Sequence, residues 1–124
     1  MATTTLDAWD ELAAADPALA DELMTRVARG AELLDRRKPG WAAKINLDRL
    51  AMNSCDDCLL GQLYGNYFDG KGRLRISLGC DLGFDAGGIV EQRKGKANEF
   101  DALAALWRRQ VRSRLATAGE VALG

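Results

Sequence analysis

The longest regular pattern of apolar and polar positions lies over Pro17–Arg37. Apolar residues recur at helical spacing and share one arc of a helical wheel, whereas charged residues share the opposite arc. Asp16 suits the N-cap, and Pro17 suits the first helical position because its missing N–H would have no partner there. The pattern therefore predicts one long amphipathic helix. Its apolar arc holds Leu19, Ala20, Leu23, Met24, Val27, Gly30, Ala31 and Leu34.

Similar patterns predict a helix near each end of the chain. After a disordered lead over residues 1–5, Thr5 can cap a helix over residues 6–15. Asn98 can cap a final helix, whose tail over residues 117–124 we expect to fray. The apolar stripe of this helix is Phe100, Leu103, Ala104, Trp107, Val111 and Leu115.

The middle of the chain predicts a central helix over residues 54–68. Ser54 can cap it, and Asp57 stands three residues later, where a capping box places an acidic residue. Gly61 and Gly65 cost helix stability, which indicates that another element packs closely there. The buried arc would hold Cys55, Cys58, Leu59, Gln62 and Leu63. We expect this helix to form a structural hub from Cys58, Gly61, Gln62, Gly65, Trp41 and Trp107.

Residues 38–40 break the long helix before a short helical turn over residues 41–45. A brief helical piece follows up to Met52. If Gln62 is buried, its amide needs partners, and backbone groups after Pro39 or Gly83 are candidates.

Residues 69–72 read as a turn, and the alternation over residues 73–78 is typical of a strand. This strand could pair with residues 88–92 in a short β-hairpin. A competing interpretation makes residues 76–82 helical, ending at Gly83. Residues 86–98 are rich in glycine and lysine and predict a mobile surface loop.

Together these elements predict a mainly α, compact single-domain helical bundle over residues 1–124, with room for that one short hairpin. Within it, residues 6–29 form an acidic helical extension and residues 30–115 a common core. No apolar run is long enough for a membrane span, and no signal-peptide pattern opens the chain. We therefore expect a cytoplasmic protein that contacts no membrane; three cysteines fit a reducing compartment. The oligomeric state stays open.

Charge is divided unevenly along the chain. Residues 1–35 carry a net charge of −6, and residues 36–124 carry +5. The simplest interpretation is that the two parts attract each other and pack. The alternative is an anionic partner. It could be nucleic acid, bound by basic residues of the last helix and helped by those near 93–96; the helix residues are Arg108, Arg109, Arg112 and Arg114.

The candidate chemistry is sparse because the chain has no histidine, the commonest general base. Cys55 and Cys58 form a C-x-x-C pair, but the βαβ context of redox proteins is missing. A zinc site could combine Cys55, Cys58 and Cys80 with Asp81 or Asp85, but structural zinc sites nearly always use four Cys or His ligands. We therefore predict no bound metal, no cofactor and no catalytic residue.

A succession of short motifs resembles a group of small uncharacterised proteins of actinobacteria, other Gram-positive bacteria and their bacteriophages. The motifs are Pro39-Gly40-Trp41, the stretch from Cys58 to Gly65 (CLLGQLYG), Gly83-Phe84-Asp85, Phe100-Asp101 and Trp107, and the similarity spans roughly residues 30–112. The resemblance implies a small cytoplasmic protein encoded by a phage or prophage, and it brings no activity or catalytic residue.

By elimination and by this resemblance, we expect a non-enzymatic protein-interaction module that modulates a host protein. Its candidate contact residues are Arg108, Arg109 and Arg112. The alternatives are a small nucleic-acid-binding regulator and a zinc-stabilised module.

Overall fold

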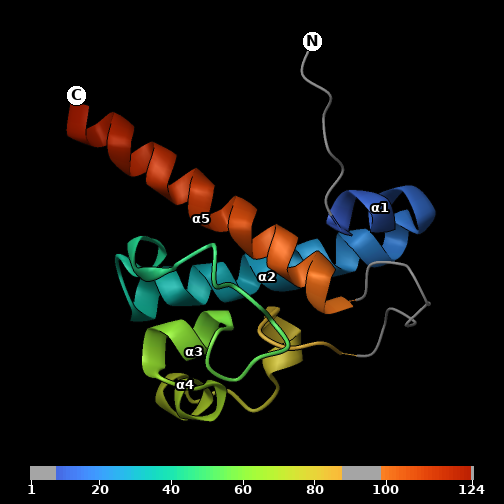
Figure 1. The fold of residues 1–124 in the computed structure, drawn as a ribbon, viewed down its shortest axis with the longest axis horizontal. Helices are drawn as coiled ribbons and strands as arrows, with labels where there is room; N and C mark the ends of the chain where they lie inside the picture. Colours follow the sequence, from blue (N-terminus) through green and yellow to red (C-terminus); the bar gives the residue numbers. More distant parts are fainter. Residues whose placement is uncertain (1–7, 88–98, 124) are drawn as a thin grey trace.

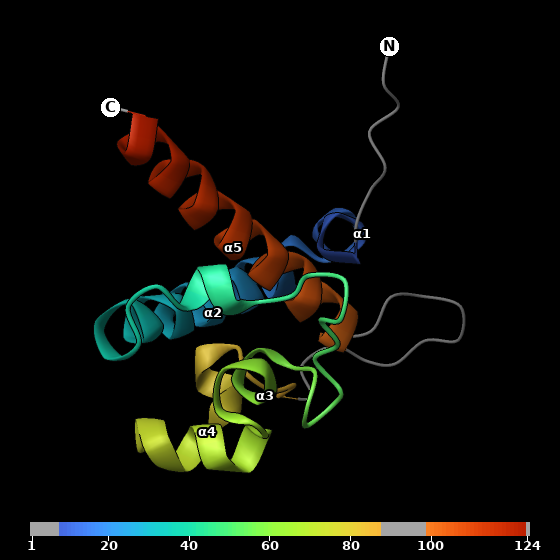
Figure 2. The same ribbon diagram turned by 60° about the vertical axis from the view of Figure 1, so that its left-hand side comes forward.

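The computed structural model describes residues 8–87 and 99–123, with the backbone alone for residues 117–123. Over these ranges the chain is mainly α-helical, as predicted, and forms no β-strand. In both views, α2 lies between the diagonal α5 and the α3–α4 pair (Figures 1 and 2). The elements are α1 (Ala8–Ala15), α2 (Pro17–Arg37), the 3-10 helix η1 (Trp41–Lys44), α3 (Leu59–Tyr64), α4 (Tyr67–Leu74), the 3-10 helix η2 (Gly79–Leu82) and α5 (Glu99–Leu123).

The long helix α2 forms where the pattern predicted it. The carboxylate of Asp16 accepts a hydrogen bond from the backbone N–H of Leu19 at 3.2 Å, and Pro17 occupies the first turn. The predicted apolar arc faces the core, apart from Met24, which is exposed. Buried positions on α2 are Ala20, Leu23, Val27, Gly30, Ala31 and Leu34.

The core centres on Trp107 of α5. Its ring stacks on Phe84 at 5.3 Å between centroids and meets the ring of Trp41 edge-on at 5.7 Å. Its indole N–H donates to the carbonyl oxygen of Gly83 at 2.7 Å, so the ring is buried with its polar group satisfied. Gly83 has a φ of 73° and lies so close to Val27 that a Cβ would come within 2.6 Å of it. The predicted core roles of Trp41 and Trp107 are therefore confirmed.

Among the described residues, ion pairs of Arg109 and Arg114 join the acidic first third of the chain to α5. Arg109 binds Asp10 at 3.0 Å, and Arg114 binds Asp35 through two hydrogen bonds of 2.8 and 2.7 Å. Asp35 also accepts a hydrogen bond from the indole N–H of Trp41 at 3.0 Å. Because hydrogen bonding to Arg114 stabilises its charged form, the pKa of Asp35 is lowered. The expected attraction between the two oppositely charged parts therefore acts inside the fold.

The prediction of one helix over residues 54–68 was wrong. The helix α3 begins only after Cys58, which acts as its N-cap, and it ends at Gly65, whose φ of 100° leaves the helical region. Asn66 then caps the separate helix α4. Ser54 still accepts a hydrogen bond from the N–H of Asp57 at 3.1 Å, but it does so in a turn that precedes α3.

Two neighbouring predictions were also wrong. Residues 69–72 are helical rather than a turn, because they lie within α4. Residues 73–78 form no strand, because α4 runs to Leu74 and Arg75 then takes a left-handed conformation with a φ of 56°. The competing interpretation was closer, since η2 covers Gly79–Leu82 and Gly83 is its C-cap.

Several predictions fall outside the described residues. They are the lead over residues 1–5 with its Thr5 cap, the hairpin partner over residues 88–92, the loop beyond Gly87 and the Asn98 cap. At the other end, α5 continues to Leu123, past Thr117, where we expected fraying. No helix among the described residues is long and apolar enough to cross a membrane.

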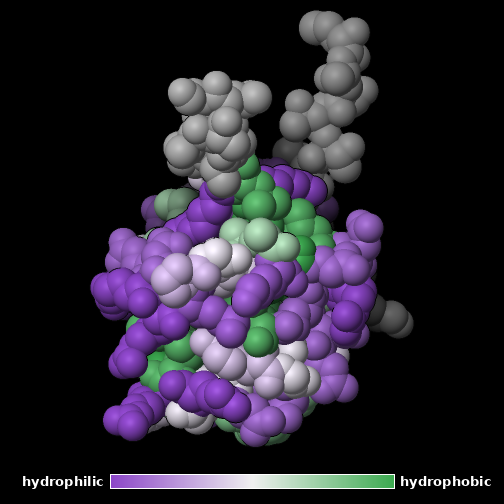
Figure 3. Space-filling view, turned by 90° about the vertical axis from the view of Figure 1, so that its left-hand side faces the viewer, coloured by the Kyte–Doolittle hydropathy of each residue, from purple (hydrophilic) through white to green (hydrophobic). Residues whose placement is uncertain are grey.

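One face of the molecule is drawn in space-filling form in Figure 3. Hydrophilic residues cover most of this face, and hydrophobic residues reach the surface in separate areas rather than in one continuous patch (Figure 3). Some large apolar side chains are exposed among the described residues. They are Met24, Phe68, Leu78 and Leu115.

Candidate functional site

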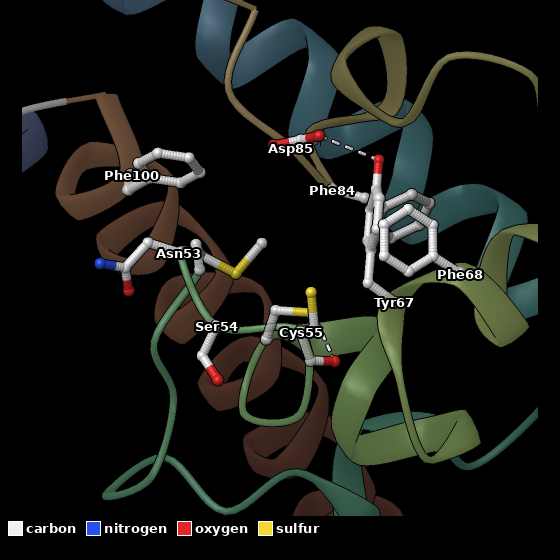
Figure 4. A pocket seen from close by; sticks show the side chains of 10 residues that line it. Asn53, Ser54, Cys55, Tyr67, Phe68, Phe84, Asp85 and Phe100 are labelled. Atoms are coloured by element: carbon white, nitrogen blue, oxygen red, sulfur yellow. Dashed lines mark hydrogen bonds between the residues drawn. The ribbon is translucent and has the colours of Figure 1, made fainter.

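A half-open pocket of about 160 Å³ lies where the turn before α3, the start of α4 and the loop after η2 come together. In Figure 4, Tyr67 and Phe68 stand on one side of it, Phe100 and Asn53 on the other, with Asp85 above and Cys55 below. The lining is mainly apolar with a few polar groups, as is usual for ligand pockets. Its residues are Met52, Asn53, Ser54, Cys55, Cys58, Tyr67, Phe68, Phe84, Asp85 and Phe100.

The floor of the pocket is a tight turn held against α3. The carbonyl oxygen of Cys55 accepts a hydrogen bond from the N–H of Tyr67 at 2.8 Å, which ties the turn to α4. Gly61 packs on the same turn so closely that a Cβ would lie 2.4 Å from the oxygen of Cys55. Gly61 is therefore part of the predicted hub, although its close neighbour is a turn and not another helix. Gly65 plays a different part, because it terminates α3 with no atom near its missing side chain.

Gln62 completes this hub in the way the sequence predicted. Its side-chain oxygen accepts a hydrogen bond from the N–H of Asn46 at 2.6 Å, and its nitrogen donates to the carbonyl oxygens of Asn46 and Asp57, both at 3.1 Å. Asn46 lies in the loop that follows Pro39, where partners were expected. One amide side chain thus joins η1, the turn and α3.

All three cysteines are free; Cys55 is exposed, so the prediction that it lies on a buried arc was wrong. Cys58 is buried, and burial raises the pKa of its thiol, so the thiolate that nucleophilic chemistry requires is disfavoured. Its Sγ instead accepts a hydrogen bond from the N–H of Gly61 at 3.3 Å. Cys80 lies on η2, apart from the pocket lining. Within the described ranges, no three Cys, Asp or Glu side chains converge as metal ligands.

Tyr67 and Asp85 form the polar edge of the pocket. The hydroxyl of Tyr67 donates to Oδ2 of Asp85 at 3.1 Å, and Oδ1 of Asp85 accepts from the N–H of Ala86 at 2.8 Å. Burial, and then the charge and hydrogen bond of Asp85, raise the pKa of Tyr67 above its ordinary range. The phenol therefore stays protonated and holds the carboxylate in place.

The three arginines predicted to bind a partner have different surroundings. Arg109 pairs with Asp10 and lies over the ring of Trp9, with 4.6 Å between the guanidinium carbon and the ring centroid. Arg108 reaches the carbonyl oxygen of Leu50 at 3.4 Å. Arg112 is exposed and, among the described residues, forms no hydrogen bond or ion pair. The fold thus uses two of the three arginines internally.

Sequence reasoning missed the pocket itself. The sequence suggested Asp85 as a zinc ligand and as part of a short motif, and it placed Tyr67 and Phe68 in a helix. Two features could have pointed to them: adjacent aromatic residues in a polar stretch, and an aromatic–aspartate pair after a glycine at residues 83–85. The long-range contact between residues 67 and 85 left no periodicity to detect.

Comparison of the chain with protein-family models, curated proteins and solved structures found no match in any of the three. The candidate site is therefore described from its own geometry.

Proposed function

We propose that this chain is a non-enzymatic protein-interaction module and that its contact surface is the rim of the pocket. The observation that carries this proposal is the exposure of Phe68, whose side chain stands 68% exposed at the pocket edge. Burying a phenylalanine side chain recovers about 1.5–3 kcal/mol of hydrophobic free energy. A single exposed aromatic beside a depression is a common anchor at protein interfaces.

The chemistry of the pocket supports binding rather than catalysis. The one carboxylate among the described lining residues, Asp85, already accepts a hydrogen bond on each oxygen. Its buried thiol, Cys58, is held protonated by the raised pKa. The chain also lacks histidine, so the usual proton-transfer group is missing.

The setting that we propose is the cytoplasm of a bacterial host, with the module encoded by a phage or prophage and acting on a host protein. The resemblance of the motifs between residues 39 and 107 to small phage and actinobacterial proteins supports this setting. The arginine surface on α5 has less support as the contact site, because Arg109 and Arg108 are held by Asp10 and Leu50. For the same reason a nucleic-acid partner is the weaker alternative.

A quantitative affinity capture from an actinobacterial lysate tests the proposal. The bait is the intact chain, and the matched variants are Phe68→Ser at the pocket rim and Leu115→Ser on α5, since both side chains are exposed. We expect the wild type and Leu115→Ser to capture a protein that Phe68→Ser does not capture. Nuclease treatment of the lysate should not change this result. Capture that is unaffected by Phe68→Ser, or that disappears with nuclease, would contradict the proposal.

A further inference from the structure

The walls of the pocket have an unusual chemical bias. Among the described residues that line the pocket, four of ten are aromatic, Asp85 contributes a carboxylate, and none is lysine or arginine. The rings come from three separate segments, with Tyr67, Phe68 and Phe84 on one side of the space and Phe100 on the other (Figure 4). The aromatic set is Tyr67, Phe68, Phe84 and Phe100.

This bias favours a positively charged guest. The face of an aromatic ring carries negative electrostatic potential and attracts cations, most strongly where water is partly excluded. The ring of Tyr67 already attracts one within the chain, because Nζ of Lys71 lies 5.4 Å from its centroid.

The hydrogen-bond acceptors of the pocket indicate which kind of cation it can bind. A primary ammonium brings three donors that must each find an acceptor when water leaves. In this pocket each oxygen of Asp85 already accepts one hydrogen bond, from Tyr67 or from Ala86, which leaves the carboxylate fewer lone pairs than three donors need. A fully methylated ammonium keeps its charge but has no N–H to satisfy, so aromatic walls with one nearby carboxylate suit it better.

The size of the pocket agrees with such a group. Its volume is about 160 Å³. Cavities of about 150 Å³ accept benzene-sized guests, and a trimethylammonium group is of comparable size. Because the pocket is half-open, the remainder of the ligand can extend into solvent.

We propose that this pocket is a binding site for a quaternary ammonium group, held by the aromatic walls and the charge of Asp85. The group could belong to a free small molecule such as choline or to a trimethylated lysine of a peptide. The inference uses the same pocket as the proposed function, but choline binding requires no protein partner, so the two proposals can fail separately.

Titration of the intact chain with choline, followed by NMR chemical shifts, tests the proposal. We expect saturable binding with a Kd on the order of millimolar, as a few cation–π contacts would give. The matched control ligand is the neutral tert-butyl analogue of choline, in which carbon replaces nitrogen. It should bind at least about tenfold more weakly, because it has the same shape but no charge. A peptide bearing trimethyllysine, compared with the same peptide bearing leucine, reveals whether a peptide is the source of the group.

Variants locate the site. Asp85→Asn keeps an acceptor for Tyr67 and should weaken choline binding about tenfold. Asp81→Asn is the matched control, because it removes the same charge from an exposed residue outside the pocket lining; choline binding should stay unchanged. Phe68→Leu changes an exposed ring and cannot unfold the core, and it should weaken binding about threefold. Two results would overturn the proposal: no saturable binding of choline or of the trimethyllysine peptide, or equal binding of the charged and neutral ligands.

Discussion

Replacement of Gly61 by alanine should destabilise the protein, although it places a better helix former in α3. In an open helix position, glycine to alanine gains about 1 kcal/mol. At Gly61 the new Cβ would lie 2.4 Å from the carbonyl oxygen of Cys55 and 2.6 Å from backbone atoms of Asp56. These neighbours are backbone, so no side chain can rotate away to relieve the clash.

The size of the effect follows from what must move. Overpacking of this kind costs about 1–3 kcal/mol. Displacing the turn also strains the hydrogen bond from the N–H of Tyr67 to Cys55, and losing such a bond costs about 1 kcal/mol. After the gain in helix propensity is subtracted, the free energy of unfolding should fall by about 1–3 kcal/mol. The melting temperature should fall by about 4 °C for each kcal/mol in a chain of this size.

Urea unfolding followed by far-UV circular dichroism measures this change. Gly72 supplies a matched control, because it lies in the helix α4 and a Cβ there would meet no atom within 4 Å. Gly72→Ala should therefore raise the urea midpoint, because it should increase the free energy of unfolding by about 0.5–1 kcal/mol. A midpoint for Gly61→Ala that equals or exceeds that of the wild type would refute the packing described for this turn.

Two further predictions concern charged and titrating groups. The pKa of Tyr67 in the folded protein lies above the unfolded value of 10.0, so Tyr67 stabilises the fold below pH 10 and this stabilisation is lost at higher pH. The free energy of unfolding measured against pH should show the loss, and Asp85→Asn should make the loss smaller. Arg109→Gln should lower the unfolding midpoint because it breaks the contacts to Asp10, whereas Arg112→Gln should change the free energy by less than about 0.5 kcal/mol, as measured by thermal unfolding.

The long helix α2 could be predicted because every local preference agrees with its tertiary role. Its cap, its proline and its apolar arc all favour the same helix, and the same arc is buried against the core. The partners of Gln62 were predictable for a similar reason. An amide that leaves water needs hydrogen-bond partners, and the half-buried Gln62 finds two of them at Asn46, in the loop that follows Pro39.

The break between α3 and α4 could not be predicted, because it depends on one backbone conformation. A glycine can lie inside a helix, at some cost in stability, or it can end a helix with a positive φ. The local sequence does not decide between these two conformations; in the structure Gly65 ends α3. Gly70 illustrates the same point. It lies buried in α4, so close to α3 that a Cβ there would come within 2.8 Å of Leu60. A residue that is typical of turns is therefore required at a contact between two helices.

The strand predicted over residues 73–78 failed for a related reason. The alternation is real, since Leu74 is buried and Arg73 and Arg75 are exposed, but it arises at the end of a helix followed by a left-handed residue. The pocket was beyond sequence reasoning because its walls come from α4, the turn before α3, the loop after η2 and α5. Such convergence depends on tertiary packing and leaves no periodic pattern.

Site-specific photo-crosslinking tests the central claim most directly. A benzophenone amino acid replaces Phe68 in the intact chain, and a second chain carries the same group in place of Leu115, which is also exposed. After irradiation in an actinobacterial host, mass spectrometry identifies the adducts. We predict one discrete protein adduct from position 68 and none of the same mass from position 115. No adduct at position 68, or the same adducts from both positions, would contradict a protein-binding role for the pocket rim.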